Sequence, residues 1–173
     1  MVRILVDEVV ETDYGQLDLC FSDDVEDDGD IGSTFAGQTN GVAGAAVPGR
    51  IYLNLGRRSG GSPVRIELHD GVVPSDAQWE DVVEVSTVVD EPGNCGWTSW
   101  AGESGGQFVL PPGPYRVRVS ARGRDAGDEN ELADDAVDFY LIQLWPAPVK
   151  PDNILRAGSE NARYLHETWG SNR

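Results

Sequence analysis

The stretch from residue 115 to residue 145 constrains the fold most, because it contains two strong strand patterns joined by an acidic segment. Within the second pattern, at residues 137–145, the segment 139–145 is apolar on both faces apart from Gln143, so a strand here needs a cover on each side. We therefore expect it in the middle of the fold. Residues 115–124 alternate with the period of two that is typical of a half-buried strand, and their apolar members are Tyr115, Val117, Val119 and Ala121.

Further strand patterns occur along the whole chain, separated by turns rich in Gly and Pro. The pattern in the first of them places Val2, Ile4 and Val6 on one face of the strand, with Arg3 and Leu5 on the other. Residues 51–55 and 64–68 are expected to pair as an antiparallel hairpin. About nine strands at this spacing predict an all-β fold, a two-sheet antiparallel β-sandwich. The strands outside the 115–145 stretch are expected at 2–6, 16–21, 51–55, 64–68, 81–89, 95–100 and 107–110.

One C-terminal α-helix is predicted at about residues 156–169. Ser159 can cap it, Glu160 favours its first turn, and Ala162, Leu165 and Trp169 fall at helical spacing. We expect this helix to cover the second face of the 137–145 strand. The whole chain, residues 1–173, is expected to form a single domain, because its length suits one core and no linker divides it.

Residues 37–49 consist almost entirely of small side chains, with Asn-Gly and Pro-Gly turn signals. Such a segment is either a structural crossover whose backbone packs closely against another element or a surface loop. We favour the structural interpretation.

The net charge of −17, from 30 acidic and 13 basic residues, limits the kinds of molecule that this chain is expected to bind. It disfavours nucleic acid and anionic membranes and favours a basic protein or a divalent cation. No stretch is long and apolar enough for a membrane helix, and the N-terminus lacks the apolar core of a signal peptide, so a cytoplasmic protein is expected. No cofactor is expected either, because the sequence contains no phosphate-binding loop motif.

Eighteen of the thirty acidic residues lie in two segments, 7–30 and 125–138, neither of which contains a Lys or an Arg. If the fold brings these segments together, they form one strongly negative face that a basic partner can contact. The candidate partner-binding residues are Asp23, Asp24, Glu26, Asp27, Asp28, Asp30, Asp128, Glu129, Glu131, Asp134 and Asp135.

Two other function classes stay open. The run at residues 23–30 could bind calcium, although it lacks the ligand order of an EF-hand loop, and Trp97 and Trp100 could form the stacking surface of a carbohydrate-type binding module. A hydrolase would use His69 or His166 as a general base, but no nucleophile motif accompanies either. Cys20 and Cys95 are expected to be unpaired thiols in or beside strands.

Arg116, Arg118 and Arg122 share one face of the 115–124 strand. In so acidic a chain they are expected to neutralise neighbouring carboxylates, for instance in the segment 125–138. A site for a carboxylate or phosphate ligand is the alternative.

The layout resembles the competence-J family of DNA-entry nuclease inhibitors over about the first 145 residues. The resemblance lies in an early strand region from Tyr14 to Phe21, the acidic loop and hairpins that follow, and Leu-Pro-Pro-Gly-Pro-Tyr-Arg-Val at residues 110–117. It implies a non-enzymatic protein that binds and blocks a nuclease, without assigning any residue. The preferred function is thus a non-catalytic acidic binding protein, such as an immunity protein or nuclease inhibitor, whose partner and oligomeric state stay open.

Overall fold

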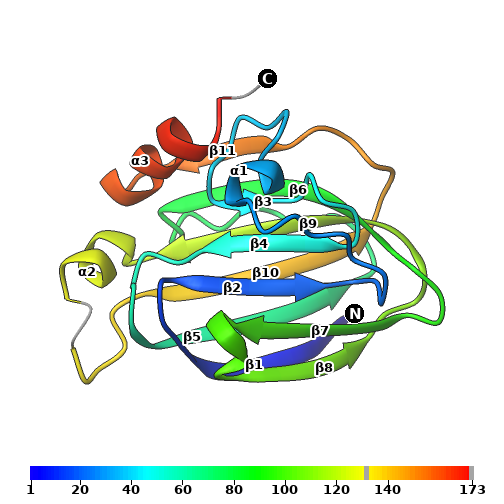
Figure 1. The fold of residues 1–173 in the computed structure, drawn as a ribbon, viewed down its shortest axis with the longest axis horizontal. Coiled ribbons are helices and arrows are strands. Elements are labelled where there is room, and N and C mark those ends of the chain that lie inside the picture. The colour runs from blue at the N-terminus through cyan, green and yellow to red at the C-terminus, as the bar shows by residue number, and fades with distance from the viewer. Residues whose placement is uncertain (131–132, 172–173) are drawn as a thin grey trace.

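The computed structural model describes residues 1–130 and 133–171, and it confirms a sandwich of two β-sheets (Figure 1). The described residues form eleven strands rather than nine, because the two-residue β3 and the edge strand β11 give weak sequence signals. Among the described pairs, only β5 with β10 is parallel. The six-stranded sheet runs in the order β1 (Val2–Thr12), β5 (Gly60–His69), β10 (Phe139–Pro146), β9 (Gly113–Arg122), β6 (Asp81–Val89) and β11 (Asn153–Ala157). The five-stranded sheet runs in the order β3 (Ala43–Gly44), β4 (Arg50–Asn54), β2 (Gln16–Cys20), β7 (Asn94–Ser99) and β8 (Gly105–Val109).

Strands β9 and β10 lie in the middle of the six-stranded sheet, as the sequence predicts. Their inward side chains alternate along each strand and meet the inner face of the other sheet in one hydrophobic cluster. The inward residues of these two strands are Tyr115, Val117, Val119, Ala121, Tyr140, Ile142 and Leu144, and all are buried.

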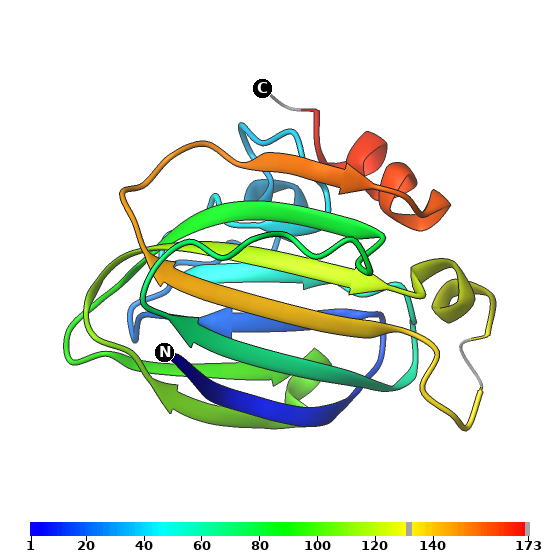
Figure 2. The ribbon, with the colours of Figure 1, turned by 180° about the vertical axis from the view of Figure 1, so that it is seen from behind.

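The prediction that the C-terminal helix covers the outer face of β10 is wrong. Arginines of β9 cover part of it instead, since the Arg118 guanidinium lies 5.1 Å from the Trp145 ring centroid and that of Arg122 lies 4.6 Å from the Phe139 ring centroid. The segment between β5 and β6 crosses the outer face of this sheet (Figure 2), where the Val73 carbonyl accepts a 2.6 Å hydrogen bond from Arg118.

Glu84 of β6 forms ion pairs with two of these arginines. Its carboxylate accepts from Arg116 Nε at 3.1 Å and from Arg118 Nε and Nη2 at 3.0 and 2.9 Å. All three side chains are buried. Internal pairing of the arginines is therefore confirmed for Arg116 and Arg118, but the partner lies on the neighbouring strand and not in the segment 125–138.

The expected hairpin between residues 51–55 and 64–68 is also wrong. Strand β4 pairs with β2 and β3, whereas β5 belongs to the other sheet and pairs with β1 and β10. The glycine-rich connection at residues 56–60 thus carries the chain from one sheet to the other. Period-two alternation marks the buried face of each strand and does not identify the strand beside it.

Strand β1 contains a β-bulge, so Val2 and Ile4 do not share a face with Val6 as the pattern predicts. Ile4 lies opposite Glu67 and Val6 opposite Ile66, so Leu5 is the extra residue. Val6 and Val10 face the core, whereas Val2 and Ile4 point outward and are about half exposed.

The C-terminal helix α3 (Glu160–Trp169) begins four residues later than predicted, because residues up to Ala157 form β11. Ser159 caps it as expected, its Oγ accepting from Ala162 N at 3.0 Å. Figure 1 shows α3 beside β11, at the edge of the sandwich. The described residues form three shorter helices as well: α1 (Ile31–Thr34), the 3-10 turn η1 (Trp100–Gly102) and α2 (Arg124–Glu129), the last inside a segment expected to be a loop.

The segment 37–49 is the surface against which α3 packs, which confirms the structural interpretation of its small residues. A Cβ at Gly41 would lie 1.8 Å from the Leu165 carbonyl oxygen, so only glycine allows this approach. Asp152 binds the same segment by accepting from the backbone N of Thr39 at 3.0 Å and of Asn40 at 2.8 Å.

Candidate functional site

The acidic run at residues 23–30 follows β2, and part of it is used for local structure. Asp27 forms an ion pair with Arg50. Asp28 accepts from Ser33 Oγ at 2.7 Å and from the backbone N of Asp30, and these bonds lower its pKa. Asp30 caps α1 through Gly32 N at 3.1 Å. Among the residues that the structure describes, the side chains of Asp23, Asp24 and Glu26 have no such role, and all three are exposed.

The second acidic segment lies at α2 and after it. Asp125 accepts from the backbone N of Glu160 and Asn161 at 3.1 and 2.8 Å, and thereby binds the first turn of α3. Asp128 and Glu129 are exposed on α2. Asp134 and Asp135 are exposed as well, and Glu131 lies outside the described residues.

The structure does not bring these two segments together. Figure 1 shows α2 at one end of the sheets, whereas the chain leaves β2 at the opposite end to form the run 23–30. The hollow beside that run is lined by Asp27 and Asp30 and shares no residue with the cleft beside α2. The candidate residues therefore form two separate acidic surfaces rather than one face.

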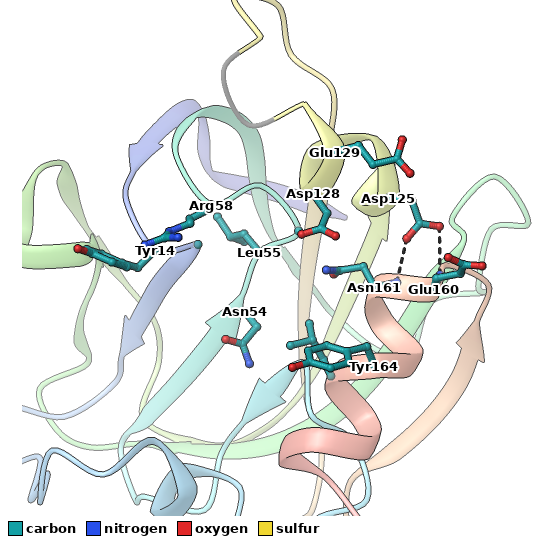
Figure 3. Close-up of a pocket in the computed structure, with 13 residues that line it drawn as sticks. Tyr14, Asn54, Leu55, Arg58, Asp125, Asp128, Glu129, Glu160, Asn161 and Tyr164 are labelled. Atoms are coloured by element: carbon teal, nitrogen blue, oxygen red, sulfur yellow. Dashed lines mark hydrogen bonds between the residues drawn. The ribbon is translucent and has the colours of Figure 1, made fainter.

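The surface beside α2 contains a cleft of about 490 Å³, which we call the acidic cleft. Figure 3 shows residues of α2 and of the first turns of α3 on one side, Tyr14 and Arg58 on the other, and Asn54 and Leu55 between them. Its ionisable lining comprises four carboxylates and one guanidinium, so the cleft favours a cation. The lining residues are Tyr14, Gly15, Asn54, Leu55, Gly56, Arg58, Asp125, Asp128, Glu129, Glu160, Asn161, Tyr164 and Leu165.

Exposed aromatic side chains border the acidic cleft. Tyr14 is 58% exposed and Tyr164 is 64% exposed. The Tyr14 ring lies 4.8 Å from the ring of Trp100 and 5.0 Å from the guanidinium of Arg58. Tyr14 adopts a left-handed φ of 59°, which is unusual for a bulky residue and holds its ring at the cleft. Tyr, Trp and Arg are the residue types that contribute most to protein interfaces.

More negative charge lies next to Tyr14. Glu103, just after η1, shares a hydrogen bond with Asp13, which raises the pKa of Glu103. Two carboxyl groups in contact repel each other when both are ionised. A cationic group of a partner would relieve this repulsion.

A buried polar network fixes the walls of the cleft. Arg124, at the start of α2, is 1% exposed, and its Nη1 donates to Asn161 Oδ1 of α3 at 3.3 Å. Its Nε lies 3.9 Å from Asp81, whose carboxylate also accepts from Ser159 Oγ at 2.7 Å. Helices α2 and α3 are thus tied to each other and to β6 by the buried side chains of Arg124, Asp81 and Ser159 and the partly buried Asn161.

The two histidines lie in different environments, and neither is among the residues that line the acidic cleft. His69 Nε2 is 2.8 Å from Glu67, and Gln143 is its other close neighbour. His166 is buried under α3, where its Nδ1 accepts from Gly41 N at 2.9 Å. Among the described residues, neither imidazole ring forms a hydrogen bond with a Ser, Thr or Cys side chain.

The alternative of a carbohydrate-type stacking surface made by Trp97 and Trp100 is contradicted, because Trp97 is only 3% exposed while Trp100 is 38% exposed. Within residues 1–130 and 133–171, no group of three or more His, Cys, Asp or Glu is arranged to hold a metal ion. Cys20 and Cys95 are free thiols, as predicted. None of the described helices is long and apolar enough to cross a membrane.

Comparison with solved structures identifies the architecture. The crystal structure of ComJ from Bacillus subtilis, an inhibitor of the DNA degrading activity of NucA, matches with a TM-score of 0.57 and 18% identity over 85% of this chain and 99% of ComJ. This chain has a ComJ-like fold. The protein of crocagin biosynthetic gene J matches with a TM-score of 0.55 and 16% identity over 86% of this chain and 99% of its own. No protein-family model and no curated protein match the sequence.

The resemblance inferred from the sequence is therefore confirmed for the fold. Sequence reasoning identified Asp128 and Glu129 but missed Asp125, Glu160 and the aromatic residues at the cleft. The signal for Tyr14 was present, since Asp-Tyr-Gly between two strands is typical of a tight turn that exposes its middle residue.

Proposed function

We propose that this chain is a non-catalytic inhibitor that binds the basic surface of a nuclease or toxin-like protein. The observation that carries the proposal is the acidic cleft with its exposed tyrosines, on a fold shared with ComJ, an inhibitor of a DNA-degrading protein. Nucleases present cationic side chains to the phosphates of their substrate. A clustered set of carboxylates can occupy the same side chains and exclude the nucleic acid.

The two classes of side chain at the cleft support different steps of binding. Long-range attraction from Asp128, Glu129 and their neighbours speeds the encounter with a basic protein. Tyr14 and Tyr164 then supply rigid apolar area that stabilises the complex. An arginine or lysine of the partner can contact both a carboxylate and a tyrosine ring in the cleft.

A matched pair of variants tests the surface. Asp128→Asn/Glu129→Gln removes two charges at the cleft, and Asp23→Asn/Asp24→Asn removes two from the run 23–30; all four side chains are exposed. A partner is first captured from a lysate of the source organism with the wild-type chain, identified, purified and assayed as a nuclease. We expect the cleft variant to bind roughly tenfold more weakly, mainly through slower association, and to show a smaller salt dependence.

The run 23–30 stays a second candidate contact surface, and the same measurement decides between the two. A loss of affinity in the Asp23/Asp24 variant alone would move the contact to that surface. A captured partner whose nuclease activity is unchanged at saturating amounts of this chain would refute inhibition. Loss of binding in Tyr14→Ser, with the fold intact, would support the aromatic contribution.

A further inference from the structure

His166 holds the C-terminal helix through a hydrogen bond that requires a neutral ring. Gly41 N donates to His166 Nδ1 at 2.9 Å, and the side chain is 7% exposed. A ring nitrogen that accepts carries no proton, so the proton of the neutral ring is on Nε2. Among the described residues, Nε2 has no hydrogen-bond partner. A second proton would have to enter at Nδ1 and would remove the bond to Gly41.

Three charged groups from the elements packed around His166 act on it. Arg124 of α2 opposes a positive ring, whereas Asp81 of β6 and Asp152 after β10 favour one. Both carboxylates are already engaged, Asp81 by the 2.7 Å hydrogen bond from Ser159 and Asp152 by the backbone of the segment 37–49. That segment contains no ionisable side chain. Burial is the largest influence and lowers the pKa of His166 below its ordinary value.

The same helix forms one wall of the acidic cleft. Glu160, Asn161 and Tyr164 line the cleft, and the turn that contains Leu165 and His166 rests on Gly41. Because backbone meets backbone at this contact, the helix cannot adjust by moving a side chain. If it leaves Gly41, the position of the cleft wall changes with it.

We propose that α3 is a pH-sensitive wall of the acidic cleft, held in place by neutral His166 on Gly41 and released when Nδ1 is protonated. The release itself is independent of the proposed function. Its effect on partner binding rests on that function and on the cleft as the contact surface.

The direction of the effect follows from linkage. The undocked histidine takes up a proton near pH 6.5, whereas the docked one does so at lower pH. Docking is therefore complete above about pH 6.5 and weakens as the pH falls below it. The docking equilibrium changes tenfold for each pKa unit between the two states.

Hydrogen exchange between pH 7.5 and 5.5 tests the release without any partner. After correction for intrinsic exchange, we expect the amides of Gly41 and α3 to open more often at pH 5.5 in the wild type. His166→Asn places an amide oxygen where Nδ1 accepts and cannot titrate, so its opening should not change with pH. His69→Asn, at the other histidine of the chain, should behave as the wild type does. Equal pH dependence in the wild type and His166→Asn would overturn the proposal.

A measurement on the wild type covers the case in which His166→Asn does not fold. Nitrogen NMR of His166 should show the proton on Nε2 at pH 7.5 and a titration midpoint below 6.5; a midpoint at or above that value would overturn the proposal. Once a partner is known, wild-type affinity should fall from pH 7.5 to 5.5 and that of His166→Asn should not. Affinity independent of pH, with release observed, would reject the cleft as the contact surface and leave the release supported.

Discussion

Replacing Glu84 by Gln should test whether the arginines of β9 are stabilised by their buried counterion. Glu84 is 8% exposed and accepts three N–H groups from Arg116 and Arg118, which are 1% and 4% exposed. Glutamine keeps one accepting oxygen but removes the charge. Breaking a buried ion pair costs about 3–5 kcal/mol, because the remaining charge has lost its partner.

That loss is a large part of the total stability of about 5–15 kcal/mol expected for a folded protein. With a urea dependence of about 2 kcal/mol per molar, the unfolding midpoint should fall by about 2 M. Urea unfolding followed by tryptophan fluorescence gives the free energy directly. Trp145, under Arg118, reports on this part of the sheet.

Asp7→Asn is the matched control. It removes one negative charge, as Glu84→Gln does, but its ion pair with Arg65 is long at 3.4 Å, and the two side chains are 63% and 41% exposed. Its free energy of unfolding should change by less than about 1 kcal/mol. If Glu84→Gln costs no more than Asp7→Asn, the buried pair is not what stabilises this region.

Two glycine substitutions and the chemical labelling of the two cysteines test the packing. Gly41→Ala should displace α3 and lower the free energy of unfolding by about 2 kcal/mol or more, because the added Cβ meets the backbone of Leu165. Gly71→Ala is the control and should be nearly neutral, because its Cβ meets nothing within 4 Å. Equal melting temperatures of the two variants would contradict the role of Gly41. Burial raises the pKa of Cys95 to about 11, so roughly one Cys95 side chain in a thousand is a thiolate at pH 8. Cys95 of the folded protein should therefore react slowly with a disulfide reagent. Cys20, which is partly exposed, should react first, and rapid labelling of Cys95 without urea would show that the site opens.

The strands were predictable because each is a local pattern, but their arrangement was not. The alternation in residues 51–55 identifies the buried face of β4 correctly, yet it cannot show that β5 crosses to the other sheet. The bulge at Leu5 was hidden for a related reason. An extra residue leaves the composition of a strand unchanged while it reverses the facing of the residues before it.

The position of α3 also depends on contacts that are distant in sequence. Ser159 and the spacing of Ala162 and Leu165 identify the helix, whereas its place is set by Gly41, more than a hundred residues earlier. For the same reason the cleft was only partly predictable. Asp128 and Glu129 are visible as acidic residues, but the tyrosines line the cleft only because the fold brings α3 and the Tyr14 turn to α2.

The buried charges strengthen the case for a basic partner. At least four arginines are buried, and among the described acidic residues Asp18, Asp81, Glu84 and Asp138 are buried too. Equal numbers of each sign leave the net charge of −17 on the surface, where fewer bases remain to interrupt it. The ratio of acids to bases that a partner meets is therefore higher than the composition indicates. Salt should weaken binding at the acidic cleft more than pairing within the protein, because the exposed charges are screened and the buried ones are not.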